Sequence, residues 1–155
     1  MTKNPQKPLR PMPELRQELG QTIGEVSRAW RHHMNQRLKP FGLNVSMRQV
    51  LIQLHRHPDG LMQRELAEKL GIEGPTLVRL LDRLEKREWI KRIVAGDDKR
   101  RKYAVLSTKA SEQLEIIEKQ SQALRSEMMK GLSATELENG LGIMSRLRDN
   151  LLKKS

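Results

Sequence analysis

The chain has 155 residues, which suits one domain, and carries 30 Lys and Arg against 19 Asp and Glu, a formal net charge of +11. This excess favours an anionic partner such as nucleic acid, an acidic protein or a membrane surface. The absence of cysteine excludes disulfides, thiolate metal sites and cysteine nucleophiles, and it fits the cytoplasmic location that we expect. No apolar run is long enough for a transmembrane helix or for the core of a signal peptide.

The first part of the chain predicts an arm followed by two helices. Residues 1–13 (MTKNPQKPLRPMP) combine prolines with basic residues and predict a flexible arm, or a tail without a role. In residues 14–38 apolar side chains recur at steps of three and four, which predicts one long helix. Pro40 ends this helix because it cannot continue the hydrogen-bond ladder. The capping-box pattern SMRQ at Ser46–Gln49 predicts the start of the next helix, and HPDG at His57–Gly60 predicts the turn that closes it.

The middle of the chain predicts a helix-turn-helix. A short helix at Met62–Leu70 is followed by a turn that begins at Gly71, and Pro75 suits the first position of a second helix at Thr76–Glu88. Ala67 is small where two crossing helices must approach closely, and Gly71 can adopt the left-handed conformation that a sharp turn needs. The apolar positions in register with this arrangement are Leu66, Leu70, Ile72, Leu77 and Leu80.

The remaining sequence predicts two short strands and two helices. Trp89–Ala95 and Lys102–Leu106 have the length and the β-branched content of strands. A helix is predicted at about 107–130, and the capping box SATE at Ser133–Glu136 announces the last one. This order of helices and strands predicts a mainly α fold (α+β) of the winged helix-turn-helix type. The predicted domain spans residues 14–152. Its parts are the helix-turn-helix at 63–86, the wing at 90–106 and dimerisation helices at 14–38, 108–130 and 134–152.

The terminal helices predict a homodimer. Their apolar stripes are too long for the central module to cover, and a second copy in a symmetric dimer would cover them. Gly20 and Gly24 in the first helix, and Gly140 and Gly142 in the last, cost roughly 1 kcal/mol each relative to alanine. Close approach of helices would offset this cost, and a frayed or kinked helix is the alternative.

The second helix of the helix-turn-helix predicts a face that reads DNA. Its leucines cluster on one side and its basic residues on the other, as a recognition helix in the major groove requires. Pro75, Thr76 and Arg79 near its start are predicted to reach base edges. Arg83 and Lys86 are predicted to contact phosphates, although for this helix alone a solvated basic face is the alternative. The chain has two Trp, one Tyr and one Phe, too few for the stacking that holds single strands, which favours double-stranded DNA.

The stretch VAGDDKRRKYAVLS at 94–107 predicts a wing with a basic tip. Lys99, Arg100 and Arg101 are predicted to reach the adjacent minor groove, whose negative potential attracts cations. Asp98 is predicted to orient Arg100, because an aspartate can fix a turn through backbone N–H groups and hold a guanidinium in one geometry. A surface hairpin with a tip of mixed charge is the alternative.

The stretches LAEKLGIEGPTLVRLLDRLEKREWIKR and DDKRRKYAVLSTKA resemble the MarR family of bacterial transcription regulators, most closely its SlyA-like branch. The positions that match family motifs are Trp30–Arg31, Arg37–Pro40, Gly71–Glu85, Asp98, Arg100, Leu106 and Ser107. The resemblance spans about residues 15–152. It implies a homodimer whose first and last two helices intertwine and which presents two winged modules to a palindromic operator, as a repressor or an activator.

The resemblance also implies roles for single residues. Pro75, Thr76 and Arg79 match major-groove readers, and Lys99 and Arg100 match wing residues near the minor groove. Many relatives are released from DNA by small anionic aromatic molecules that bind between the dimerisation helices and the winged module. The matching stretch of the first helix contains Arg28, Trp30 and Arg31.

Three positions depart from the family pattern. In the wing, Lys99 replaces the usual arginine and Arg101 replaces a small residue. Glu88 stands before the first strand, where relatives commonly have glycine.

Other chemistries find little support in the sequence. The histidines, His32, His33, His55 and His57, lack the spacing of a metal site, and we expect no metal or cofactor. No HExxH, GxSxG or P-loop motif is present, so we expect no enzyme. A less specific nucleoid-type or structured-RNA-binding protein and a ligand-free structural dimer remain as alternatives.

Overall fold

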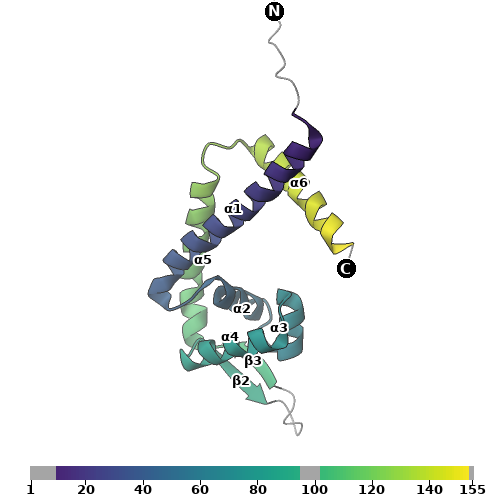
Figure 1. The fold of residues 1–155 in the computed structure, drawn as a ribbon. Helices are drawn as coiled ribbons and strands as arrows, with labels where there is room; N and C mark the ends of the chain where they lie inside the picture. The colour runs from purple at the N-terminus through teal and green to yellow at the C-terminus, as the bar shows by residue number, and fades with distance from the viewer. Residues whose placement is uncertain (1–9, 95–101, 154–155) are drawn as a thin grey trace, which may run out of the picture. The chain divides into compact units, whose positions relative to one another are not determined.

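The computed structural model describes residues 10–94 and 102–153 (Figure 1). Contacts divide the chain into two compact units, Met1–Gln120 and Ser121–Ser155, and α5 contributes residues to both. The helices are α1 (Met12–Leu38), α2 (Val45–His55), α3 (Gln63–Leu70), α4 (Gly74–Lys86), α5 (Thr108–Met128) and α6 (Ala134–Leu152). The 3₁₀ turn η1 (Lys39–Phe41) follows α1. Among the described residues, no helix is both long and apolar enough to cross a bilayer.

The first unit contains a small antiparallel sheet. Its strands are β1 (Leu61–Met62), β2 (Ile90–Val94) and β3 (Lys102–Leu106), in the order β1-β3-β2. Strands β2 and β3 pair from Ile90 opposite Leu106 to Val94 opposite Lys102, so the two strands form one antiparallel ladder. The fold is the mainly α winged helix-turn-helix that the sequence predicts.

The hydrophobic core of this unit lies between the helix-turn-helix and α2. Leu77, Leu81 and Leu84 of α4 are at most 1% exposed, as is Leu66 of α3. They pack in a core with Met47, Leu51 and Leu54 of α2, Trp89, and Ile90 of β2. Truncation of a buried leucine to alanine typically costs about 2–5 kcal/mol, so this core holds α4 firmly while its other side faces outward.

Several helices begin at other residues than predicted, because local hydrogen bonds determine where they start. The prediction that Ser46–Gln49 caps α2 is wrong, because the Asn44 side chain accepts a 2.9 Å hydrogen bond from the Met47 N–H and the helix begins at Val45. Pro75 is the second residue of α4, not the first, because Leu77 N donates to Glu73 O and the helix begins at Gly74.

Two further boundaries differ for the same kind of reason. The predicted arm ends earlier than residue 13, since Leu15 N donates to Pro11 O and α1 begins at Met12. Met62 was expected in a helix but belongs to β1, where it pairs with Tyr103. Within the helix-turn-helix, Gly71 adopts the predicted left-handed conformation with φ of 62°.

The second unit consists of the end of α5 and all of α6. The capping box predicted at Ser133–Glu136 is confirmed, because the Ser133 hydroxyl accepts from Glu136 N and the Glu136 carboxylate accepts from Ser133 N. The Ser133 backbone N–H and its hydroxyl both donate to the Glu136 carboxylate, and these two bonds lower the pKa of Glu136 below its ordinary value. None of the 19 residues of α6 is buried in the chain.

Candidate nucleic-acid interface

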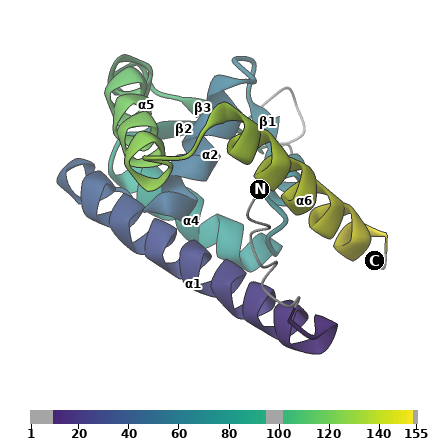
Figure 2. The ribbon, with the colours of Figure 1, turned by 90° about the horizontal axis from the view of Figure 1, so that it is seen from above.

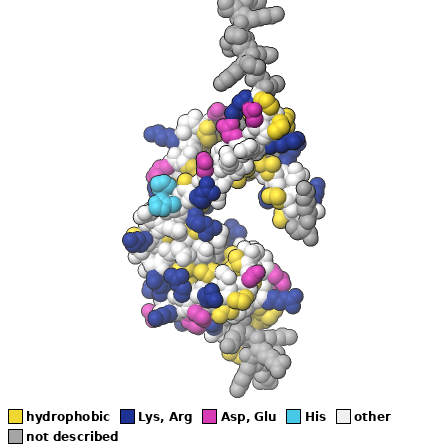
Figure 3. All heavy atoms as spheres, viewed as in Figure 1, with side chains coloured by type: hydrophobic (Ala, Val, Ile, Leu, Met, Phe, Trp, Pro, Cys, Tyr) yellow, Lys and Arg dark blue, Asp and Glu magenta, His cyan; other side chains and the backbone are white. Residues whose placement is uncertain are grey.

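Helix α4 presents a charged face opposite its buried leucines. Pro75, Thr76, Arg79, Arg83 and Lys86, the residues predicted to contact DNA from this helix, are all exposed. Because Leu77, Leu80, Leu81 and Leu84 are buried, the two sets occupy opposite sides of one helix, as predicted. Figure 3 shows Lys and Arg side chains (dark blue) gathered over the part of that view where Figure 1 places α4.

The cations of this face are available to an external anion. No residue in the described parts of the chain forms an ion pair with Arg79, Arg83 or Lys86. The guanidinium groups can donate bidentate hydrogen bonds to phosphates or to guanine, and the ammonium group offers a point charge.

The start of α4 borders an open hollow of the helix-turn-helix. This hollow, of about 630 Å³, is lined by Gln63, Arg64 and Ala67 of α3 and by Gly71, Ile72 and Gly74 around the turn. Glu73 precedes the first turn of α4 and makes no side-chain capping hydrogen bond. The first backbone N–H groups of the helix therefore lack a side-chain cap from Glu73, and such groups attract anions.

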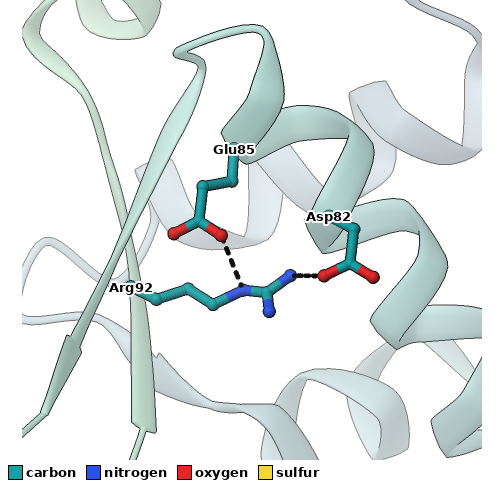
Figure 4. A network of polar contacts seen from close by, with 3 residues as sticks. All are labelled: Asp82, Glu85 and Arg92. Carbon is teal, nitrogen blue, oxygen red and sulfur yellow. Dashed lines mark hydrogen bonds and ion pairs between the residues drawn. The ribbon is translucent and has the colours of Figure 1, made fainter.

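A third set of charges on α4 was missed in the sequence. Asp82 and Glu85 lie on the flank of the helix that faces β2, and both contact Arg92 of that strand (Figure 4). Arg92 Nη2 donates to Asp82 Oδ1 at 2.5 Å, and Arg92 Nε lies 3.5 Å from Glu85 Oε2. Asp82 and Glu85 of α4 are thus paired with the sheet, away from the basic face of the helix.

The end of α4 is fixed by contacts to neighbouring elements. Arg87 donates to Gly42 O at 2.5 Å, and the Ser107 hydroxyl donates to Glu88 O at 2.7 Å. Glu88 has φ of 60°, the left-handed region that glycine adopts most readily. The position where relatives commonly carry glycine is therefore a true left-handed helix end in this chain.

The wing is described only in part. Strands β2 and β3 lie within one residue of the predicted strands. The predicted minor-groove cations Lys99, Arg100 and Arg101, and the predicted orienting residue Asp98, lie outside the described residues.

The residues predicted to bind a ligand lie on α1. Arg28 and Arg31 are exposed and Trp30 is half-buried. A Cβ atom added at Gly24, one turn before Arg28, would lie 3.2 Å from Arg28 Nη1, so this guanidinium folds back along the helix.

Comparisons with known proteins agree with this geometry. A family model described as the MarR family matches residues 41–101. The crystal structure of the transcriptional regulator PA3341 is 36% identical, with a TM-score of 0.74, 87% of this chain covered and 98% of that chain covered. The structure of the transcriptional regulator SlyA shares the fold at 24% identity, with a TM-score of 0.78 and coverage of 88% and 95%. The MepR–DNA complex of S. aureus matches at 25% identity, with a TM-score of 0.78 and coverage of 84% and 96%.

The predicted family is confirmed by these matches, because PA3341 exceeds 30% identity over nearly its whole length and the family model covers the helix-turn-helix and β2. The chain belongs to the MarR family of transcriptional regulators, and its class is accordingly that of a DNA-binding regulator and not of an enzyme.

Proposed function

We propose that the protein is a homodimer that binds a palindromic operator in double-stranded DNA and is modulated by a small anionic aromatic ligand. The observation that carries the proposal is the face of α4 with Arg79, Arg83 and Lys86, which is exposed and unpaired among the described residues. MepR, to which the chain is similar, has been crystallised with DNA, which supports DNA as the partner.

In the proposed complex, α4 lies in the major groove with its leucine face turned away from the DNA. Pro75, Thr76 and Arg79 in its first turns reach base edges, where arginine can contact guanine through two hydrogen bonds. Arg83 and Lys86, further along the helix, contact phosphates. The phosphate contacts supply affinity that salt weakens, and the base contacts supply sequence preference.

The wing extends the proposed interface to the minor groove. Lys99, Arg100 and Arg101 carry its positive charge, and Asp98 orients Arg100. We therefore expect Asp98→Ala to weaken operator binding, although it removes a negative charge. Tighter binding by Asp98→Ala in a fluorescence anisotropy titration would mean that the aspartate only repels DNA.

Exposed apolar stripes on the terminal helices support the homodimer. Helix α1 exposes Leu19, Ile23 and Val26, and α6 exposes its own larger set. The apolar side chains exposed on α6 are Leu137, Leu141, Ile143, Met144, Leu151 and Leu152. Exposed apolar surface of this extent in a single chain is typical of an interface, and a second copy has the matching surface.

The glycines of these helices support the same interface. Figures 1 and 2 show α1 as one unbroken helix, and both α1 and α6 continue through their glycines. A Cβ atom added at Gly20, Gly140 or Gly142 would meet no described atom of the chain within 4 Å. The small residues therefore serve no contact inside the described chain, and close packing against a partner helix accounts for them.

The proposed ligand site uses Arg28, Trp30 and Arg31 of α1. Two guanidinium groups can bind a carboxylate, and the half-buried indole offers a face for an aromatic ring. We expect aromatic carboxylates to raise the unfolding temperature and to release DNA. Failure of every aromatic carboxylate to stabilise the protein would remove this part of the proposal.

Selection of bound sites from random duplexes tests the DNA-binding proposal most directly. The expected result is a palindromic site whose half-site centres lie about 34–36 Å apart, one turn of the double helix. Competition with structured RNA at a fixed salt concentration is the control. Selected duplexes that share no sequence preference would indicate a nucleoid-type protein. Displacement of the bound duplex by structured RNA would indicate an RNA-binding protein.

A further inference from the structure

Two carboxylates on the recognition helix create an electrostatic conflict. Asp82 precedes Lys86 by four residues and follows Arg79 by three, and side chains at both spacings are neighbours on a helix surface. An intrahelical ion pair with either cation would neutralise a group that the proposed interface needs. Each unpaired carboxylate on α4 would also repel the phosphates of an approaching duplex.

The structure resolves the conflict through Arg92. Its guanidinium contacts Asp82 at 2.5 Å and Glu85 at 3.5 Å, and neither Arg79 nor Lys86 pairs with a described residue. Figure 4 shows the two carboxylates turned toward the sheet and the guanidinium between them.

The position of Arg92 in the sheet explains why it prevails over the helical cations. It lies in the middle of β2, opposite Ala104 of β3, which is only 3% exposed. Its side chain is 19% exposed, while those of Asp82 and Glu85 are 57% and 44% exposed. The guanidinium is thus partly dehydrated, and the two carboxylates offset the hydration that it loses.

We infer that Arg92 is a positioning residue for DNA binding: it captures Asp82 and Glu85 and thereby leaves the cations of α4 free for the duplex. This inference rests on the proposed function. Arg92 itself acts through the carboxylates and touches no DNA. Its removal would leave two carboxylates on α4 without their partner, and Asp82 would then pair with Lys86 or Arg79.

The test compares dissociation constants of purified full-length variants for a duplex taken from the selection, at one salt concentration. Loss of one charge-assisted contact predicts about tenfold weaker binding for Arg92→Met. Arg92→Lys keeps the charge and should recover part of the loss. The triple variant Arg92→Met, Asp82→Asn and Glu85→Gln should bind within about twofold of the parent chain, because no carboxylate remains to capture.

Three outcomes would overturn the inference. Equal affinity of Arg92→Met and the parent chain would show that capture of the carboxylates is unimportant for binding. An equal loss in Arg92→Met and in the triple variant would show that Arg92 contacts DNA or only supports the fold. If Arg92→Met fails to fold by circular dichroism, the double variant Asp82→Asn and Glu85→Gln decides. It should bind at least as tightly as the parent chain, and weaker binding would show that the carboxylates themselves position α4.

The parent chain separates this inference from the proposed function. A parent chain that binds no duplex would refute the proposed function. A parent chain that binds its selected duplex, with Arg92→Met equal to it, would refute the role of Arg92 alone.

Discussion

At the scale of the residue, Glu88 is the position among the described residues where a side chain other than glycine adopts a positive φ. Its φ of 60° lies in the left-handed region, which costs a residue with a Cβ atom roughly 1–2 kcal/mol. The surrounding hydrogen bonds keep it there: Trp89 N donates to Leu84 O at 3.0 Å, and the Ser107 hydroxyl donates to Glu88 O. This is a helix end of the kind that glycine usually makes.

Substitution Glu88→Gly should therefore stabilise the protein. Glycine removes the left-handed strain from the folded state, and it also stabilises the unfolded chain through its greater conformational freedom. We expect the first effect to be larger, so the free energy of unfolding should rise by about 0.5–1 kcal/mol. The free energy of unfolding is measured by urea denaturation, with circular dichroism as the signal. The matched control is Arg83→Gly within α4, which should lower stability by about 1 kcal/mol. A decrease for Glu88→Gly would mean that the glutamate side chain stabilises the fold.

At the scale of the element, α4 combines three separate surfaces on one helix. Its leucines are buried, its acids face β2, and its cations face outward. Each surface has a different task, since the first fixes the helix, the second ties it to the sheet and the third is the one that we propose binds DNA. A substitution on the third surface can thus alter binding with little effect on folding.

Arg79→Ala tests that third surface. We expect operator binding to weaken by about 1–3 kcal/mol and preference at one base position to relax, because a bidentate contact to a base would be lost. Affinities for the selected duplex and for single-base variants of it measure both effects. Arg125→Ala, which removes the same charge from an exposed position of α5, is the control. Unchanged affinity for Arg79→Ala at fixed salt would exclude this residue from base readout.

The helices and strands also show which parts of the fold could be predicted from the sequence alone. The two faces of α4 followed from the spacing of its leucines, because a helix of 3.6 residues per turn leaves little choice. The start of α2 did not follow from the sequence, because both Asn44 and Ser46 can cap a helix. The backbone conformation of the folded chain makes Asn44 the N-cap. Strand β1 escaped prediction because its two residues pair with β3, more than forty positions away, as Leu61 does with Ala104.

The ion pairs of Arg92 could not be predicted for a related reason. Ten residues separate Arg92 from Asp82, and a helix end and a strand lie between them. Only the packing of β2 against α4 brings the guanidinium to the carboxylates. The sequence pattern thus identified the basic face of the candidate site, while the contacts that keep this face unpaired depend on tertiary structure.

At the scale of the whole molecule, the exposed apolar stripes of α1 and α6 are the feature that a single chain leaves unexplained. Leu141 is 69% exposed and Leu151 is 72% exposed, although both belong to a regular helix with a complete capping box. A second chain that covers these side chains would bury apolar surface worth about 25 cal/mol per Å².

Leu141→Lys should therefore disrupt the proposed homodimer. A charge that is placed in an apolar interface without a partner weakens association by about 3 kcal/mol. Sedimentation equilibrium at micromolar concentration should show the parent chain as a dimer and the variant largely as a monomer. Asn139→Lys adds the same charge on the opposite side of α6 and should stay dimeric. If Leu141→Lys stays dimeric as well, the interface lies elsewhere.

The lack of buried residues in α6 has a consequence for how the protein responds to its own abundance. No residue of α6 is fully buried in its own chain, and a helix with so little packing is only marginally stable in water. If the proposed homodimer forms, dilution should accordingly lower the mean ellipticity of the protein, because the subunits separate and α6 frays. Where dimers are scarce, occupancy of a regulated promoter would rise with the square of the chain concentration, so a modest change in expression would have a steep effect.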